Sequence, residues 1–260
     1  MKISIVIPAY NEENRIGKTL EAYSDYFEKL KRENELDYEI LIVINNTADK
    51  TEDIVLAAKK KNPAVRHLNF KQGGKGFAII EGFKDSLTRE NDLIGFVDAD
   101  MATSPDAFHD LVKNIGSYDG AIADRYSPFS RIEPTYNFRR IVVSRVFNMI
   151  VRTLFGFKFR DTQCGAKVFR KDILKKILND LTITEWAFDV DLLYSAKRNK
   201  FKIRAVPTFW REMSGSRLNI KKASIQMLFA VIQLRILRSK FKRVLNLLSP
   251  ITKTLYGTIK

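Results

Sequence analysis

The chain has 260 residues, of which 45% are hydrophobic and 29% charged, which excludes a disordered segment and allows one large or two modest domains. Cys164 is the only cysteine, so internal disulfides are excluded and a reducing compartment is expected. The formal net charge of +15 is unevenly spread: residues 1–135 hold 18 Lys and Arg against 23 Asp and Glu, whereas residues 136–260 hold 27 against 7. This imbalance predicts an anionic partner, namely a nucleic acid, a phosphorylated ligand or an anionic membrane.

The first half alternates between strand-like and helix-like segments. Apolar, β-branched runs predict strands at 2–8, 38–44, 65–70, 92–97 and 120–124. Helical spacing of apolar residues predicts helices over 12–32 and 51–60, a third that ends near 88, and a fourth that begins at Ser104 and Pro105. This order predicts an α/β domain with a doubly wound, mostly parallel, Rossmann-like sheet.

The second half is basic and amphipathic. Residues 136–156 interleave arginines with large apolar residues, which predicts an interface helix. A strand is expected at 165–170, a helix at 184–198 and a strand at 201–209, before a long basic helix over 219–248. Residues 218–260 are expected to form a region that lies on an anionic membrane surface; the alternative is a helix packed on the domain with a solvated cationic face.

A membrane span is not expected in this chain. The longest uncharged stretch near the C-terminus, residues 223–234, is well short of the roughly 20 residues that a span requires. The apolar run at the N-terminus is short and lacks a small-residue cleavage site, so no signal peptide is expected.

Polar residues follow three of the predicted strands. Asp98 and Asp100 come directly after the fourth strand, and two carboxylates at i and i+2 can converge on one ion where a strand ends. Carboxylate oxygens suit Mg²⁺ or Mn²⁺, which also bind substrate phosphates. The alternative is a helix cap plus a solvated turn aspartate. Because ligands bind beyond the carboxyl ends of parallel strands, the polar residues after the first two strands belong to the same candidate site; they are Tyr10, Asn11, Glu12, Asn45 and Asn46.

Two further groups of residues suit phosphate. The segment 73–76, Gly-Gly-Lys-Gly, opens a helix with Lys75 at its start, which favours an anion, although a plain turn is the alternative. Arginines between 125 and 145 present the planar fork that matches phosphate oxygens, or they merely decorate a helix surface. No Ser-His-Asp or Cys-His arrangement is evident, so hydrolytic nucleophilic catalysis is not expected.

Six segments carry a resemblance to a known family. They are "IVIPAYNEE" (5–13), "GGKGFAIIEG" (73–82), "VDAD" (97–100), "DTQCGAKVF" (161–169), "EWAFDVDLLY" (185–194) and "VPTFWREMSGSR" (206–217). Together they resemble the inverting GT-A glycosyltransferases of family 2, and more narrowly the dolichyl-phosphate β-glucosyltransferases and dolichyl-phosphate mannose synthases. The resemblance implies a GT-A domain over residues 1–217.

The resemblance also implies an activity. It is the metal-dependent transfer of a hexose from a nucleotide-sugar to a polyprenyl or dolichyl phosphate, by a peripheral protein at the cytoplasmic membrane face. The matching segments favour UDP-glucose as the donor. Alternatives are a GDP-mannose donor, a non-lipid saccharide acceptor, and a non-catalytic nucleotide-sugar binder. A nucleic-acid-binding protein is favoured only by the charge, since no recognition motif accompanies it.

The implied site residues follow from position. Pro8, Tyr10, Asn11, Glu12, Asn45, Asn46, Lys75, Ala99 and Arg211 are expected at the nucleotide and its diphosphate, with Asp98 and Asp100 on the metal. Asp161, Gln163, Asp189 and Asp191 are expected at the sugar, and Arg125, Arg140, Ser144 and Arg217 at the acceptor phosphate. The residues expected to act in catalysis are Asp100, Asp189, Asp191, Arg125 and Arg140.

The loop after the second strand departs from the family pattern. The family carries acidic residues there, as in "DDGSTDGT", whereas this chain has "INNTADKT" (44–51). Asn45 and Asn46 are interpreted as replacements of the two acids, in a loop one residue shorter. Asparagine still donates and accepts hydrogen bonds, so binding can survive, but the identity of a catalytic base is left open.

Overall fold

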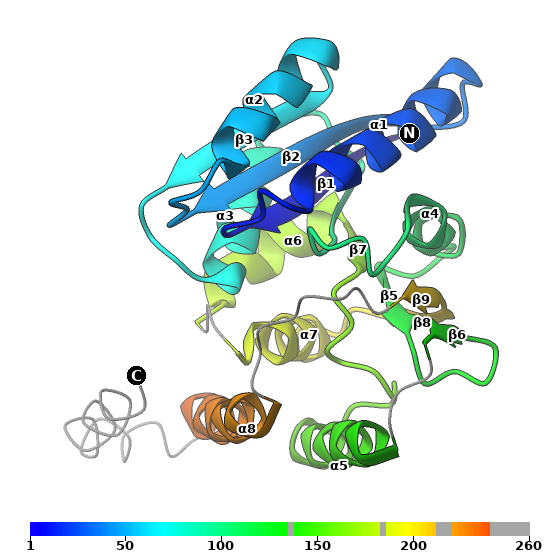
Figure 1. The fold of residues 1–260 in the computed structure, drawn as a ribbon. Helices are drawn as coiled ribbons and strands as arrows, with labels where there is room; N and C mark the ends of the chain where they lie inside the picture. Colours follow the sequence, from blue (N-terminus) through cyan, green and yellow to red (C-terminus); the bar gives the residue numbers. More distant parts are fainter. Residues whose placement is uncertain (135–137, 183–185, 212–219, 240–260) are drawn as a thin grey trace.

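The structure is a computed structural model that describes residues 1–134, 138–182, 186–211 and 220–239; of residues 138–140 and 220–224 only the backbone is described. A seven-stranded sheet runs through the molecule in the order β3-β2-β1-β4-β7-β5-β8 (Figure 1). Its strands are β1 (Lys2–Ala9), β2 (Asp37–Asn45), β3 (Val65–Phe70), β4 (Leu93–Phe96), β5 (Gly120–Asp124), β7 (Lys167–Arg170) and β8 (Ile203–Pro207).

The expected mostly parallel sheet is confirmed, and one strand departs from it. β7 lies between β4 and β5 and runs antiparallel to both. A second, two-stranded sheet pairs β6 (Arg131–Glu133) with β9 (Phe209–Arg211). This small sheet was not predicted, because each of its strands is too short to show a period-2 pattern in the sequence.

Helices cover both faces of the sheet. They are α1 (Ile16–Arg32), α2 (Thr51–Lys61), α3 (Lys75–Leu87), α4 (Pro105–Lys113), α5 (Phe138–Phe155), α6 (Lys171–Ile177), the 3₁₀ turn Leu178–Asp180, α7 (Phe188–Arg198) and α8 (Ile220–Leu237). Successive side chains of a strand point to opposite faces, so Ile5 and Ile7 pack towards α1 and α4, whereas Val6 packs towards α3, α6 and α7. The alternation of buried residues therefore fixes a three-layer fold.

The helices α5, α7 and α8 form a further apolar cluster on the lower side of the molecule in Figure 1. Val151 of α5, Val190 of α7 and Val231 of α8 are fully buried within it. The end of α8 is held by Arg238, whose guanidinium pairs with the buried carboxylate of Asp191 at 2.5 Å. The expected helix over 219–248 is thus observed as far as residue 237; residues 240–260, the proposed boundary at 217 and Arg217 lie outside the described residues.

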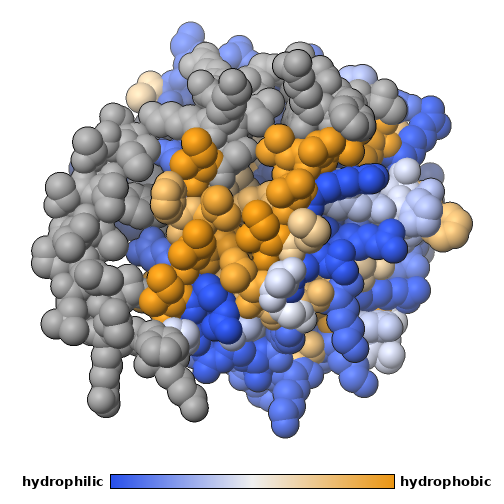
Figure 2. All heavy atoms as spheres, turned by 90° about the horizontal axis from the view of Figure 1, so that it is seen from below, coloured by the Kyte–Doolittle hydropathy of each residue, from blue (hydrophilic) through white to orange (hydrophobic). Residues whose placement is uncertain are grey.

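The outer side of α5 and α8 is apolar. Figure 2, seen from below, shows hydrophobic side chains gathered on one face of the molecule. The exposed large apolar residues of the two helices are Val142, Val143, Val146 and Met149 on α5 and Ile225, Phe229 and Ile232 on α8. Among the described helices, none is long and apolar enough to cross a membrane.

Candidate active site

The topology brings distant segments to one edge of the sheet. β1, β2 and β4 are parallel, so the residues that follow them emerge at the same edge. Because β7 is antiparallel to β4 and β5, the segment that precedes β7, residues 161–166, emerges at that edge as well. The candidate site is therefore built from four strand ends and the start of α3.

The loops after β1 and β2 are joined to each other. The backbone N–H of Ala48 donates to the side-chain oxygen of Asn11 (3.0 Å), and the backbone N–H of Glu12 donates to the hydroxyl of Thr51 (2.8 Å). The Glu12 carboxylate in turn accepts two hydrogen bonds from the Arg15 guanidinium, at 2.6 and 2.7 Å. These contacts hold Pro8 half-buried and leave Tyr10 and Asn11 exposed at the rim of the site.

Asn45 links this edge to the glycine-rich segment. Its buried amide fits with the nitrogen donating to the carbonyl of Ala9 (2.8 Å) and the oxygen accepting from the N–H of Gly74 (3.1 Å). Gly74 has φ +121°, which a residue with a side chain rarely adopts. Asn45 therefore fixes the residue that immediately precedes Lys75 and α3.

The backbone at Asn46 is compatible with a second alignment of this loop. Asn46 has φ +49°, in the left-handed region that glycine adopts most readily. If residues 44–51 are aligned with "DDGSTDGT" without a gap, Asn46 takes the place of the glycine, Asn45 that of the second acid and the buried Ile44 that of the first. In that alignment the loop is not shortened and the exposed Asn46 does not take the place of an acid; the replacement of two acids by Asn45 and Asn46 stays a prediction.

Asp98 and Asp100 lie together with Lys75 at the end of β4. The Lys75 ammonium forms an ion pair with the Asp98 carboxylate. Burial alone would lower the pKa of Lys75, but the charges of Asp98, Asp189 and Asp100 outweigh it and raise that pKa. Burial, and then the neighbouring charge of Asp98, raise the pKa of Asp100. The pair of aspartates thus forms a partly buried anionic centre that favours a cation.

The carboxylates of Asp98 and Asp100 are chemically suited to a hard divalent cation. A Cβ atom added at Gly165 would fall on the Asp98 carboxylate, so only glycine at this position leaves room for that carboxylate. Within the described residues no group of three or more His, Cys, Asp or Glu side chains could hold a metal ion. At most two carboxylates would therefore come from these residues, and substrate phosphates and water would complete the shell, as Mg²⁺ and Mn²⁺ accept.

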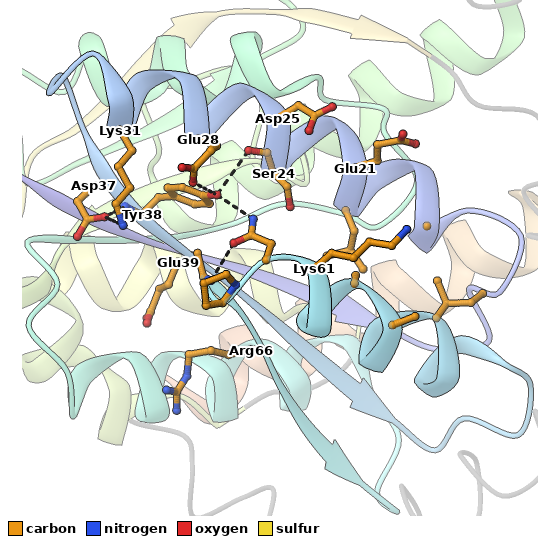
Figure 3. A pocket seen from close by; sticks show the side chains of 18 of the residues that line it. Glu21, Ser24, Asp25, Glu28, Lys31, Asp37, Tyr38, Glu39, Lys61 and Arg66 are labelled. Atoms are coloured by element: carbon orange, nitrogen blue, oxygen red, sulfur yellow. Dashed lines mark hydrogen bonds and ion pairs between the residues drawn. The ribbon is translucent and has the colours of Figure 1, made fainter.

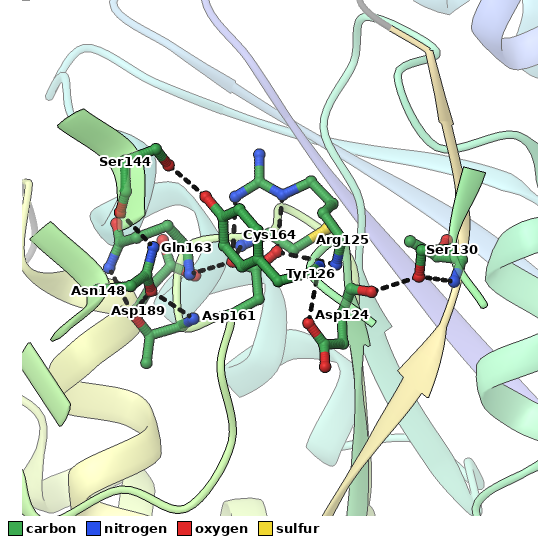
Figure 4. Close-up of polar contacts among 12 residues, drawn as sticks. Asp124, Arg125, Tyr126, Ser130, Ser144, Asn148, Asp161, Gln163, Cys164 and Asp189 are labelled. Carbon is green, nitrogen blue, oxygen red and sulfur yellow. Dashed lines mark hydrogen bonds and ion pairs between the residues drawn. The ribbon is translucent and has the colours of Figure 1, made fainter. Parts of the chain in front are cut away.

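Asp161 organises the segment that leads into β7 (Figure 4). Its carboxylate is fully buried and accepts hydrogen bonds from the Arg125 guanidinium, at 2.7 and 3.0 Å, and from the backbone N–H groups of Arg125, Gln163 and Cys164. Burial alone would raise the pKa of Asp161, but Arg125 outweighs it and lowers that pKa. Asp161 therefore fixes the Arg125 guanidinium through these hydrogen bonds. Gln163, two residues further along the chain, is half-buried.

Arg125 is connected to α5 through neighbouring side chains. The hydroxyl of Tyr126 shares a hydrogen bond with that of Ser144 on α5. Further along the helix, the oxygen of the Asn148 side chain accepts from both the backbone N–H and the hydroxyl of Thr162, each at 3.2 Å. The interface helix is thus fixed to the segment that carries Asp161, as Figure 4 shows.

A cationic cavity of about 380 Å³ opens beside these residues. Its charged lining consists of Arg125, Arg145 and Arg160, and within the described part of the chain neither Arg145 nor Arg160 forms an ion pair. Pro128, Ile132 and Ile141 contribute an apolar wall. Arg145 belongs to the arginines between 125 and 145 that the sequence predicts to suit phosphate, whereas Arg160 was not predicted; the available signal was the position of Arg160 directly before the "DTQCG" segment.

The two aspartates of α7 face different surroundings. Asp189 pairs with the fully buried Lys167 at 2.5 Å, and the Lys167 ammonium also donates to the carbonyl of Cys164 at 2.6 Å. Asp191 is fully buried and pairs with Arg238 of the α8 end. Residues two apart on a helix point to nearly opposite sides. Asp189 accordingly pairs with Lys167, and its charge contributes to the raised pKa of Lys75. Asp191 instead pairs with Arg238 at the end of α8.

The remaining expected residues are placed in part. Arg211 ends β9, and its backbone N–H donates to the carbonyl of Ala102, two residues after Asp100. Its side chain is exposed, 3.5 Å from the Glu133 carboxylate. Ala99 is buried, and its carbonyl accepts from the Thr19 hydroxyl at 2.7 Å. The side chain of Arg140 is outside the described part of the structure, as is Arg217.

A larger cavity, of about 1060 Å³, lies between α1, α2 and the beginnings of β1 and β2, at the opposite edge of the sheet (Figure 3). Its polar groups bind one another: the Tyr38 hydroxyl donates to Glu28 (3.0 Å) and accepts from Asn62 (2.9 Å), and Lys31 pairs with Asp37 (3.0 Å). None of the expected site residues lines it, so the candidate site remains at the carboxyl edge.

Two comparisons of sequence define the class of this protein. Residues 4–178 match the family model of glycosyl transferase family 2, and the match covers more than half of the chain. The chain belongs to this family and is a glycosyltransferase. Among its relatives, dolichyl-phosphate beta-glucosyltransferase of Dictyostelium discoideum is 32% identical over 90% of this chain and 73% of its own length. The Homo sapiens protein of the same name is 30% identical over 84% of this chain and 69% of its own length.

Solved structures confirm the expected GT-A fold. Glucosyl-3-phosphoglycerate synthase from Mycobacterium tuberculosis in complex with UDP superposes with a TM-score of 0.66 at 18% identity, covering 92% of this chain and 82% of that one. The same enzyme in complex with Mn²⁺, UDP and glucosyl-3-phosphoglycerate superposes with a TM-score of 0.65.

Proposed function

We propose that the protein transfers glucose from UDP-glucose to dolichyl phosphate or a related polyprenyl phosphate at a membrane surface, with Mg²⁺ or Mn²⁺ as cofactor. The names of the relatives support the sugar and the acceptor, and the Mn²⁺ and UDP in a structural neighbour support the donor and the cation. The observation that carries the proposal is the cavity lined by Arg125, Arg145 and Arg160 with an apolar wall, because a prenyl phosphate combines a dianion with a hydrocarbon chain.

The proposed donor end is the anionic centre at β4. Asp98 and Asp100 would hold the cation, which when bound neutralises the diphosphate that leaves the sugar. The N-terminus of α3 and Lys75 offer a positive environment to the same diphosphate. Glu12, Asn11 and Tyr10 border the space where the nucleoside would lie, and Asp189, close enough to act on Lys75, is proposed to border the glucose.

The proposed acceptor end is the cationic cavity. A phosphate monoester is largely dianionic at pH 7 because its second pKa is about 6. Its oxygen can therefore attack the anomeric carbon without a strong general base, in one displacement that inverts the configuration. Arginine side chains position this oxygen and reduce the repulsion between the acceptor and the donor diphosphate. Arg140, Ser144 and Arg217 remain proposed partners of the same phosphate.

The apolar outer side of α5 and α8 is proposed to rest on the membrane that holds the acceptor. Arg145 lies on α5 and lines the cavity, so the same helix connects this face with the proposed acceptor end. The exposed apolar residues would enter the interfacial region, and the basic residues of both helices favour anionic lipids. The cytoplasmic side is part of the proposal because the family resemblance of the sequence implies it.

A donor and acceptor screen tests this function. The full chain is incubated with UDP-glucose or GDP-mannose, and with a short polyprenyl phosphate in lipid or a soluble saccharide, in Mg²⁺, Mn²⁺ or EDTA. We expect glucosyl lipid only from UDP-glucose with a divalent cation. Mannosyl lipid, a glycosylated soluble saccharide, or binding without turnover would each overturn the proposal.

The acceptor cavity is tested by Arg160→Ala. We expect the KM for polyprenyl phosphate to rise at least about tenfold, because a hydrogen bond between charged groups contributes about 1.5–3 kcal/mol. The KM for UDP-glucose should change little. Arg32→Ala on the exposed side of α1 is the matched control and should leave both KM values unchanged. Equal losses for donor and acceptor with Arg160→Ala would contradict the assignment.

A further inference from the structure

The ion pair between Lys75 and Asp98 places a protein cation on one of the two carboxylates proposed to hold the metal. Asp98 is 35% exposed and the Lys75 side chain 44% exposed, so both remain accessible to a ligand. In this arrangement the ammonium balances the Asp98 charge.

Two neighbouring cations are already paired with other carboxylates. The guanidinium of Arg15 binds Glu12 through two hydrogen bonds, and Lys167 binds Asp189 at 2.5 Å. Neither is in contact with Asp98, so Lys75 alone among these three balances its charge. Asp100 is not in an ion pair within the described residues; its carboxylate accepts from the backbone N–H of Ala102 at 3.0 Å.

Lys75 can change partners without movement of the backbone. It is the first residue of α3, and Asn45 fixes the preceding Gly74. A lysine side chain carries a compact charge on a flexible four-carbon stem. Its ammonium can therefore move from a carboxylate to a phosphate near the helix N-terminus.

We propose that Lys75 occupies Asp98 until the donor diphosphate draws the ammonium away, so that the diphosphate and the divalent cation bind cooperatively. This inference rests on the proposed function, since it assumes a nucleotide diphosphate donor. A cation that arrives alone has to displace the ammonium from Asp98 and therefore binds weakly. Once the diphosphate accepts the ammonium, Asp98 is available to the cation. The coupling is reciprocal, so the cation must tighten diphosphate binding by the same factor.

Lys75→Met separates this proposal from simple chelation. The affinities for Mn²⁺ alone, UDP alone and each in the presence of the other are measured by isothermal titration calorimetry and by the electron paramagnetic resonance of free Mn²⁺. Because UDP also ligates Mn²⁺ directly, some coupling will persist in any variant, and the decisive quantity is the affinity for Mn²⁺ without nucleotide. We expect Lys75→Met to bind Mn²⁺ alone at least about fivefold more tightly than the wild type, the lower end of typical coupling between sites. The factor by which UDP tightens Mn²⁺ binding should shrink correspondingly.

Two control variants isolate the charge at this position. Lys75→Arg keeps the positive charge and should retain the weak Mn²⁺ affinity of the wild type. Lys84→Met removes a lysine from the same helix that pairs with Glu81 at 2.6 Å, and should leave both affinities unchanged. Thermal unfolding of each variant verifies that it is folded.

The outcomes distinguish this inference from the proposed function. If the wild type binds UDP with Mn²⁺ but Lys75→Met binds Mn²⁺ alone no more tightly, the role of Lys75 is overturned and the donor assignment stands. If the wild type binds neither UDP nor Mn²⁺, the proposed function and this inference are both overturned.

Discussion

Asn45 uses both halves of its amide, one as donor to the Ala9 carbonyl and the other as acceptor from the Gly74 N–H. An ionised aspartate at this position could accept from Gly74 but could not donate to Ala9. At the level of sequence, the asparagines of this loop left the identity of a catalytic base open; the structure shows that the Asn45 amide bonds two backbone groups. A sequence does not reveal it, because the partners of a buried amide depend on which backbone groups the fold places beside it.

Asn45→Ala is predicted to lower the free energy of unfolding by about 1–3 kcal/mol, because it removes two hydrogen bonds, one to the carbonyl of the buried Ala9 and one from the N–H of the half-buried Gly74. Urea denaturation followed by circular dichroism measures this change. Donor affinity should fall as well, since Gly74 and Lys75 lose their support. Asn46→Gly is the matched control: glycine accepts the positive φ of residue 46, so stability should stay within about 0.5 kcal/mol of the wild type. An Asn45→Ala variant as stable as Asn46→Gly would refute the bridge.

At the scale of elements, the periodicity of apolar residues in the sequence predicts where strands and helices begin and end. The strands β3 and β5 begin and end at the residues expected, and the helices of the first half match within a few residues. The direction of β7 was not predictable, because a short apolar run pairs in either sense and its direction depends on distant partners. The same limit applied to the site: Asp98 and Asp100 were found as a motif, whereas the contact between Lys167 and Asp189 required the fold.

The pair of helices α5 and α8 yields a prediction about membrane binding. Replacing Phe229 or Met149, which are 57% and 59% exposed, with Glu should weaken binding to phosphatidylcholine–phosphatidylglycerol vesicles on the order of tenfold or more, because each buries a large apolar side chain in the interface. Leu56→Glu alters a 37% exposed apolar residue on α2 and serves as control. Vesicle co-sedimentation provides the measurement. Unchanged sedimentation of both helix variants would argue against this face as the membrane contact.

Over the whole molecule, the acidic and basic halves of the chain supply side chains to different parts of the candidate site. The acidic first half supplies the carboxylates at the ends of β1 and β4, and the basic second half supplies Arg145 and Arg160 of the cavity. The composition predicts an anionic partner but not where it binds, because that depends on which distant residues the fold brings together.

Acid should destabilise the whole protein through its paired carboxylates. Burial alone would raise the pKa of Glu39, but hydrogen bonds from Arg89 outweigh it and hold that pKa below its ordinary value of 4.5. The pKa of Asp161 is likewise lowered, below 3.8, by Arg125. A lowered pKa in the folded state stabilises the protein above the unfolded-state pKa, and this stabilisation is lost as the pH falls through the folded-state pKa.

The variant Glu39→Gln tests whether the Glu39 charge stabilises the protein above the unfolded-state pKa. Its deficit in unfolding free energy relative to the wild type should be largest above about pH 5 and should shrink towards about pH 3, because protonation removes the charge of Glu39 in the wild type. Arg89 keeps a partner in Asp85 in this variant, which limits the damage of the substitution. Urea denaturation at a series of pH values gives the comparison. A deficit that does not vary with pH would show that the Glu39 charge does not contribute to stability.

The position of β7 in the sheet also determines when the β4 edge can be paired during synthesis. Residues 1–113 emerge from the ribosome with everything needed for β1 to β4, yet the free edge of β4 has no partner until residues 167–170 have been made. An apolar edge strand without a partner is a surface to which other chains can pair. Until the segment that contains α5 and the residues of β7 have been translated, the free edge of β4 therefore remains available for pairing with another chain.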